Sequence, residues 1–145
     1  PGVVESGSKC SVPVTSPDFY PTLLEMAGLP QMPEQHMDGV SFMPLLKGTS
    51  RLYREAIFWH YPHYGNQGGT PGSSVRMGDF KLIEFFEDGH LELYNLREDI
   101  GEQNNLALVD PQRAKKMQKI LAQWRQGVDA KIPETNPDFI SGNKV

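Results

Sequence analysis

Two glycine-containing pairs, each beside alternating apolar runs, constrain the fold of this 145-residue chain most strongly. These are Gly78-Asp79 and Asp88-Gly89. Because such pairs tolerate the positive φ that tight turns need, they predict β-hairpins. An aromatic and β-branched run precedes them at residues 56–61 and adds a further strand. The runs flanking the turns are residues 73–77, 80–85 and 91–95. The pattern therefore predicts an antiparallel sheet of about four strands.

The clearest helix signal comes after these strands. Asp110 is a typical N-cap residue, and Pro111 suits the first helical position. Apolar residues then recur at steps of three and four up to residue 128, which predicts a helix with one face on the sheet. They are Ala114, Met117, Leu121, Trp124 and Val128. The charged residues of this helix lie mostly off that face and are interpreted as solvated surface. The predicted fold class is α+β, a sheet packed against a long C-terminal helix.

The N-terminal third has a different pattern. Residues 12–14 predict the end of a short strand, and residues 18–28 predict a helix that begins after Ser16 or at Asp18 and stops at Gly28. The apolar positions of this helix span a wide arc, so it needs cover on more than one side. A short apolar element follows, and a boundary is predicted near residues 49–51. The predicted domains are residues 1–48 and 49–145, and the tail from residue 131 is expected to be irregular.

Composition excludes several function classes. A formal net charge of −4 argues against a nucleic-acid partner, and no run approaches the ~18 apolar residues of a membrane span. The single cysteine, Cys10, allows no internal disulfide. The first residues lack a starting methionine and the pattern of a signal peptide. We therefore expect the sequence to be part of a larger protein.

The segment at residues 58–69 is the one stretch rich in groups that bind ligands. It contains two imidazoles, four aromatic rings and three glycines. A zinc site needs three or four protein ligands, so His60 and His63 would need further ligands from elsewhere in the chain. The glycines allow close approach to a ligand, and Tyr61 and Tyr64 can stack on a sugar or aryl ring. Metal binding, a packed strand end and substrate contact all remain open from these residues.

No other part of the chain forms an active site by itself. The serines occupy turns and caps, and Cys10 has no neighbour that would activate a thiol. Glu84 and Glu92 are placed to face each other across a hairpin, a pairing that is usually solvated surface. Lys81, Arg76 and Asp79 are interpreted as turn and surface-pair residues. We interpret Glu102 and Asn105 as side chains that satisfy backbone N–H groups in the turn before the helix.

Two stretches of the sequence resemble the late part of the type I sulfatases, the formylglycine-dependent, arylsulfatase-like enzymes. The first is DFYPTLLEMAGL at residues 18–29, with DGVSFMPLLKG at residues 38–48. The second is VRMGDFKLI at residues 75–83, with ELYNLREDIGEQNNLA at residues 92–107. The motifs occur in the family's order, with Asn95 and Ile100 as small departures.

The resemblance implies hydrolysis of sulfate esters by a longer protein. Enzymes of this family use a formylglycine, made from cysteine in a Cys-x-Pro-x-Arg motif, and a calcium ion held by Asp and Asn side chains. Cys10 does not match that motif, because its proline comes one position late and Val14 stands where arginine belongs. The nucleophile, Ca²⁺ and formylglycine are therefore expected in an upstream catalytic domain, and no catalytic, cofactor-binding or metal residue is assigned to this chain.

The resemblance also suggests a role for each part of the chain. Residues 1–48 correspond to a strand and helix at the end of the α/β catalytic domain of this alkaline-phosphatase-like superfamily, and residues 49–145 to its C-terminal subdomain. That subdomain lies beside the active-site mouth, which makes His60, His63 and Tyr64 candidate contacts to a sulfated glycan or small molecule. Many members of the family are exported or lysosomal. An isolated fragment is expected to self-associate through its helix at residues 18–28.

Two alternatives stay open beside the sulfatase interpretation. The aromatic residues permit a stand-alone carbohydrate-binding module, and a structural or oligomerisation module without a ligand is also possible. The helix at residues 18–28 argues against the first alternative, because it resembles part of a catalytic domain.

Overall fold

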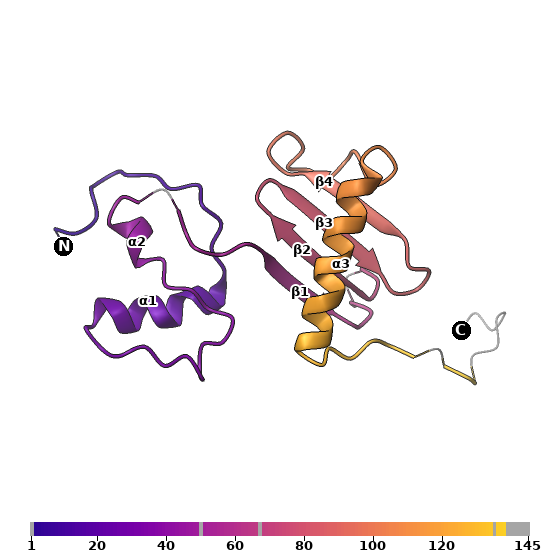
Figure 1. Ribbon diagram of the computed structural model, residues 1–145, viewed down its shortest axis with the longest axis horizontal. Helices are drawn as coiled ribbons and strands as arrows, with labels where there is room; N and C mark the ends of the chain where they lie inside the picture. The colour runs from indigo at the N-terminus through magenta and orange to yellow at the C-terminus, as the bar shows by residue number, and fades with distance from the viewer. Residues whose placement is uncertain (1, 50, 67, 135, 139–145) are drawn as a thin grey trace. The chain divides into compact units, whose positions relative to one another are not determined.

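The computed structural model describes residues 2–49, 51–66, 68–134 and 136–138. The chain divides into two compact units, Pro1–Arg54 and Glu55–Val145 (Figure 1). The boundary therefore falls six residues after the one expected at 48/49. Arg54 belongs to the first unit because its guanidinium binds Asp18 and the carbonyl oxygen of Pro13. Residues 139–145 of the expected irregular tail lie outside the described residues.

The second unit contains a four-stranded antiparallel sheet, as the turn signals predicted. Its strands are β1 (Ile57–Tyr61), β2 (Gly72–Met77), β3 (Phe80–Phe85) and β4 (Leu91–Asn95), adjacent in chain order. Met77 pairs with Phe80, so the turn between β2 and β3 is the two-residue pair Gly78-Asp79. Gly78 has a φ of 58°, the conformation for which glycine is needed.

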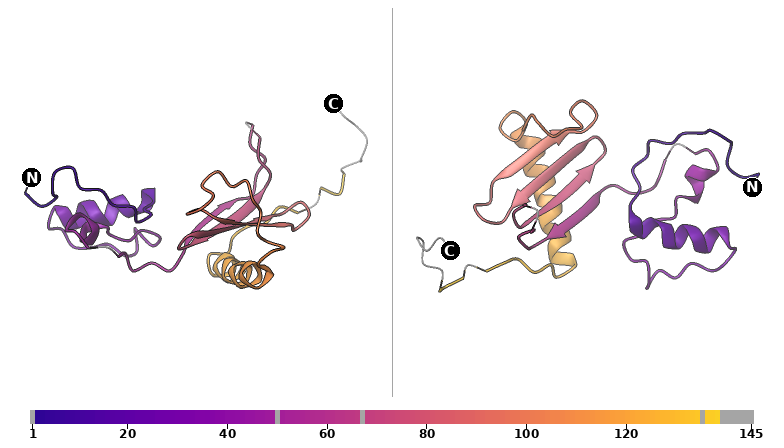
Figure 2. Two further views of the ribbon diagram at one scale, coloured as in Figure 1. Left: turned by 90° about the horizontal axis from the view of Figure 1, so that it is seen from above. Right: turned by 180° about the vertical axis from the view of Figure 1, so that it is seen from behind.

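Helix α3 (Pro111–Gly127) covers one face of this sheet, as the edge-on view in Figure 2 shows. Its N-terminus is capped as predicted, because the Asp110 side chain accepts a hydrogen bond of 3.0 Å from the backbone N–H of Arg113. Trp124 stacks on Phe58 of β1 with 4.8 Å between ring centroids. Val128 is half exposed and lies outside the core, because the helix ends at Gly127.

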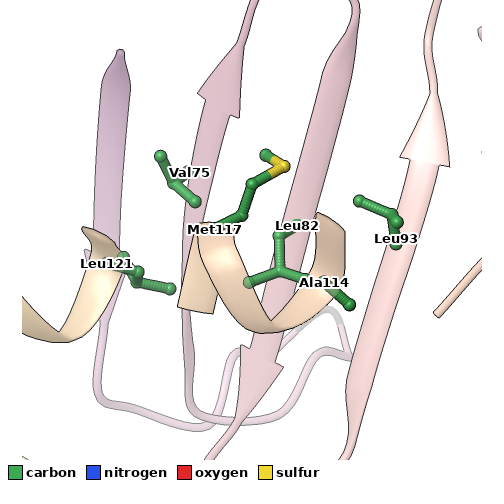
Figure 3. Packing of buried hydrophobic residues seen from close by; sticks show 6 residues of the cluster. All are labelled: Val75, Leu82, Leu93, Ala114, Met117 and Leu121. Atoms are coloured by element: carbon green, nitrogen blue, oxygen red, sulfur yellow. The ribbon is translucent and has the colours of Figure 1, made fainter. Parts of the chain in front are cut away.

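The core of the second unit lies between the sheet and α3. Val75, Leu82 and Leu93 occupy one register row across β2, β3 and β4. Figure 3 shows three side chains of α3 packed over this row. All six side chains of this cluster are at most 3% exposed. The helix residues are Ala114, Met117 and Leu121.

The observed register corrects two expectations about polar residues. Glu84 lies opposite Leu91 and Glu92 opposite Ile83, so the two carboxylates are on opposite faces of the sheet and do not meet. Among the described residues, Glu102 accepts no hydrogen bond from a backbone N–H group either. It forms an ion pair with Lys81, with an Nζ–Oε1 distance of 2.7 Å, which confirms Lys81 as a surface-pair residue.

The turn between β4 and α3 is held by the other residue expected there. Asn105 accepts hydrogen bonds from the backbone N–H groups of Leu93 and Ala107 and donates one to the carbonyl oxygen of Leu91. Its side chain thus fixes the return from the strand, as predicted. The backbone N–H groups of Gln103 and Asn104, which precede it, donate to the Asp99 carboxylate.

The first unit consists of a 3₁₀ turn (Ser16–Asp18), α1 (Phe19–Met26) and α2 (Met43–Leu46). Residues 12–14 were expected to form a strand, but in the described part of the chain they pair with no other strand. A β-strand is defined by its hydrogen bonds to a neighbouring strand, so these residues do not form one. The wide apolar face of α1 is left open within this chain, since Phe19, Leu23 and Met26 are each more than half exposed. This exposure agrees with the expectation that the helix needs further cover.

A buried carboxylate organises the first unit. Asp18 is fully buried and accepts hydrogen bonds from the backbone N–H groups of Thr15 (2.6 Å) and Val40 (2.9 Å). Its third partner is Arg54, at 2.7 Å. A side chain at Gly39 would collide with the carbonyl oxygen of Pro17, so only glycine allows this approach. The motif residues Asp18 and Gly39 therefore have structural roles.

Helix length also bears on membrane insertion. Within the described residues, none of the helices has the length and apolar character that crossing a bilayer requires.

Candidate functional site

Of the candidate site residues, His60 lies in β1, and His63 and Tyr64 lie in the segment between β1 and β2. In the left view of Figure 2 it projects away from the face on which α3 packs. Its tip is closed by backbone hydrogen bonds from Gly65 to Gly69 (3.3 Å) and from Gly68 to Gly65 (3.1 Å). A Cβ atom at Gly65 would lie 2.6 Å from the carbonyl oxygen of Gly68, so the tight tip requires glycine there. Gln67 lies outside the described residues.

His60 is held by partners on both ring nitrogens. Its Nδ1 is 2.7 Å from Oγ of the buried Ser73 on β2, and its Nε2 is 2.8 Å from the carbonyl oxygen of Lys131. Because a carbonyl oxygen only accepts, Nε2 carries a proton and donates it to Lys131. The imidazole therefore ties the chain after α3 to the sheet and also fixes the start of the candidate loop.

His63 and Tyr64 are more open. His63 is exposed, and its one described aromatic contact is a T-shaped pair with Tyr61, at 5.5 Å between ring centroids. The Tyr64 hydroxyl donates a hydrogen bond of 2.7 Å to the Glu87 carboxylate. This hydrogen bond raises the pKa of Tyr64 above its ordinary value of 10.0. The structure thus places the two side chains on one exposed loop, but in different surroundings.

Tyr64 also lines a cleft of about 600 Å³, a size typical of small-molecule sites. Phe86 and Glu87 of the β3–β4 turn form another part of it, and Glu134 and Asn136 lie after α3. The segments meet because the backbone N–H of Phe86 donates to the carbonyl oxygen of Pro71, another lining residue. His60 and His63 are not among the lining residues, so only one of the three candidates reaches this cleft.

The cleft residues besides Tyr64 were missed by the sequence analysis. Phe86 and Glu87 directly precede the Asp88-Gly89 pair, so the hairpin pattern was the available signal that they lie in the turn at one end of β3. The part from residues 133–136 has no periodic signal at all. Chemically, the aromatic rings offer stacking surfaces, and the carboxylates and the Asn136 amide offer hydrogen bonds to hydroxyl groups.

The residues present do not fit a calcium or formylglycine centre. In the described ranges no three His, Cys, Asp or Glu side chains gather where a metal ion could be held. Cys10 is exposed, and its sequence context lacks the proline and arginine positions of the formylglycine motif. We therefore derive no catalytic step through either group from this chain.

Comparisons with known proteins place these features in a family. Residues 1–130 match the model for the N-sulphoglucosamine sulphohydrolase C-terminal region. A sulfatase of Formosa agariphila is 37% identical over 86% of the chain, and an N-acetylglucosamine-6-O-sulfatase of Bacteroides thetaiotaomicron is 31% identical over 95%. The chain spans about a quarter of the length of the curated relatives it matches.

A solved structure extends the likeness to three dimensions. It shows a protein in complex with its substrate D-glucosamine-2-N,6-O-disulfate, and aligns with a TM-score of 0.75 and 27% identity over 92% of this chain and 28% of that one. The match therefore includes residues of both compact units. The chain belongs to the N-sulphoglucosamine sulphohydrolase C-terminal family, a C-terminal region of sulfatases.

Proposed function

We propose that this chain is the C-terminal region of a sulfuric ester hydrolase acting on a sulfated sugar. The observation that carries the proposal is the family match over residues 1–130, joined to relatives whose names specify sulfated sugars. In this proposal the reacting groups, Ca²⁺ and formylglycine, belong to a catalytic domain elsewhere in the protein. The chain supplies stability and part of the substrate cleft.

The open face of α1 supports contact with that catalytic domain. Phe19, Leu23 and Met26 expose 52%, 58% and 57% of their surfaces. Their burial against another domain would remove apolar surface from water at no cost to the hydrogen bonds of the helix. Residues 1–48, in this proposal, complete the catalytic domain.

Substrate contact is assigned to His63 and Tyr64. His60 is a positioning residue in this proposal, because its two ring nitrogens already bind Ser73 and Lys131. An exposed imidazole N–H suits a sulfate oxygen, most strongly when the ring is protonated. Tyr64, with its hydroxyl on Glu87, presents its ring to the sugar. The carboxylates of the cleft suit sugar hydroxyls and disfavour sulfate.

The test is His63→Ala in the full-length protein that contains this chain. Loss of one hydrogen bond to a charged sulfate, about 1.5–3 kcal/mol, lowers kcat/KM roughly 10- to 100-fold. His90→Ala is the matched control, because His90 is also exposed but pairs with Asp88 in another turn. If the His63 variant has an unchanged kcat/KM and an unchanged unfolding temperature, the assignment of this loop to the substrate site is refuted.

A further inference from the structure

The most basic segment of this acidic chain is α3. Its 17 residues contain five basic side chains and no acidic one, whereas all 18 acidic residues and only nine of the 14 basic ones lie elsewhere. The basic residues are Arg113, Lys115, Lys116, Lys119 and Arg125. The other long polar side chains of the helix are glutamines, so the single sign of charge is maintained over its whole length.

Two of the five charges are used within the fold. Arg113 pairs with Asp110 at 2.8 Å and lies over the ring of Phe80. Arg125 pairs with Glu84 at 2.6 Å, both being nearly buried. The three lysines are exposed, and none forms an ion pair with the described residues. Their charges are therefore available to a ligand.

The three lysines share one face of the helix. Lys119 is four residues from Lys115 and three from Lys116, so their side chains are neighbours about one turn apart. Like charges at this spacing repel one another and destabilise a helix. A glutamate at position 112, three and four residues before Lys115 and Lys116, would reduce this repulsion, yet the residue there is Gln112. Packing against the sheet requires none of these charges, since the core uses the opposite face.

A shallow groove of about 670 Å³ runs beside these residues. It is lined by the three lysines together with Gln112 and Gln118, which supply amide groups. Glu84 also borders it, but its carboxylate is bound by Arg125 and Gln118. Flexible ammonium groups one turn apart suit a polymer with repeated anionic groups better than one rigid, bidentate anion.

We propose that this groove, with Lys115, Lys116 and Lys119, is a second binding surface for a sulfated polysaccharide, separate from the cleft at Tyr64. The inference rests on the proposed function and deepens it, since it makes the substrate a polymer rather than a single sugar. The lining residues include no aromatic side chain for stacking bases, which disfavours single-stranded nucleic acid. The apolar face of α3 is buried on the sheet, which disfavours a lipid surface.

The test uses the full-length protein and a fluorescently labelled, fully sulfated heparin hexasaccharide. The variant K115Q/K116Q/K119Q is compared with K9Q/K47Q/K131Q, which removes three exposed lysines elsewhere and changes the net charge equally. The groove variant is expected to bind the hexasaccharide about tenfold or more weakly at low salt, with a shallower salt dependence. The control variant should change the dissociation constant less than about twofold, in keeping with the weakness of screened surface charges.

Three outcomes would overturn the inference. These are equal weakening in both variants, no weakening in either, and equal binding of a desulfated hexasaccharide. Duplex DNA bound as tightly as the hexasaccharide, and lost in the same variant, would overturn the assignment to a glycan. The binding assay does not depend on turnover, so it is independent of the proposed function. If the full-length protein releases no sulfate, but only the groove variant loses hexasaccharide binding, the proposed function is refuted and the binding surface at the groove is supported.

Discussion

Replacement of Asp18 by asparagine tests how the first unit is held together. The carboxylate is 0% exposed and Arg54 is 12% exposed, so Asp18→Asn leaves a nearly buried guanidinium without its counter-charge. Breaking one side of such a pair costs about 3–5 kcal/mol. The asparagine amide keeps only one acceptor oxygen, so its NH2 group also faces one of two backbone N–H donors, either that of Thr15 or that of Val40.

Hydrogen exchange of the α1 amides is the direct assay, because both tryptophans, Trp59 and Trp124, lie in the second unit and do not report on the first. A loss of about 3 kcal/mol or more speeds exchange in α1 at least about 100-fold. Lys81→Met is the control. It breaks an ion pair that is 24% and 30% exposed, and such pairs are worth about 0–1 kcal/mol.

The pH dependence of the same measurement has a defined sign. Burial alone would raise the pKa of Asp18, but hydrogen bonds from Val40 and Thr15 and the charge of Arg54 outweigh it and hold the pKa below its ordinary 3.8. The stability contributed by this group is thus fully present above about pH 4 and is lost as the pH falls through the folded-state pKa. Exchange in Asp18→Asn within threefold of the wild-type rate at pH 7 would refute this reasoning.

Three further predictions concern packing, ionisation and assembly. Gly39→Ala forces a Cβ against a backbone carbonyl and should cost about 1–3 kcal/mol in thermal unfolding, whereas Gly127→Ala, with open space around it, should not destabilise. Burial, followed by a neighbouring glutamate, raises the pKa of Tyr94 to about 12, so a spectrophotometric titration should lose its last tyrosine step in Tyr94→Phe. The isolated 145-residue chain should self-associate through Phe19 and Leu23, and a single monomer boundary in concentrated sedimentation would contradict this.

Most of the second unit could be predicted from the sequence, because its signals are local. The turn pair Gly78-Asp79 fixes a hairpin within a few residues, and Asp110-Pro111 marks the start of α3. Val128 was misassigned to the core, since periodicity does not state where a helix ends. The register between β3 and β4 places Glu84 and Glu92 on opposite faces of the sheet. This register depends on the length of the β3–β4 turn, which the alternation of apolar and polar residues does not determine.

The arrangement of the first unit and of the cleft could not be predicted in the same way. Asp18 was interpreted as a helix cap, but its main partner, Arg54, is 36 residues away and has no pattern that would link the two. The cleft joins Tyr64 to Glu87 and to Glu134. Contacts between such distant segments are set by tertiary packing, and the sequence offers only residue types for them.

Sulfate release is the most direct test of the proposed function. The full-length protein and the isolated 145-residue chain would be assayed side by side on a panel of sulfated sugars that includes D-glucosamine-2-N,6-O-disulfate. The full-length protein is expected to release sulfate from at least one of them and the isolated chain from none. Release by the isolated chain, or no release by the full-length protein from any sulfated sugar, would contradict the proposed function.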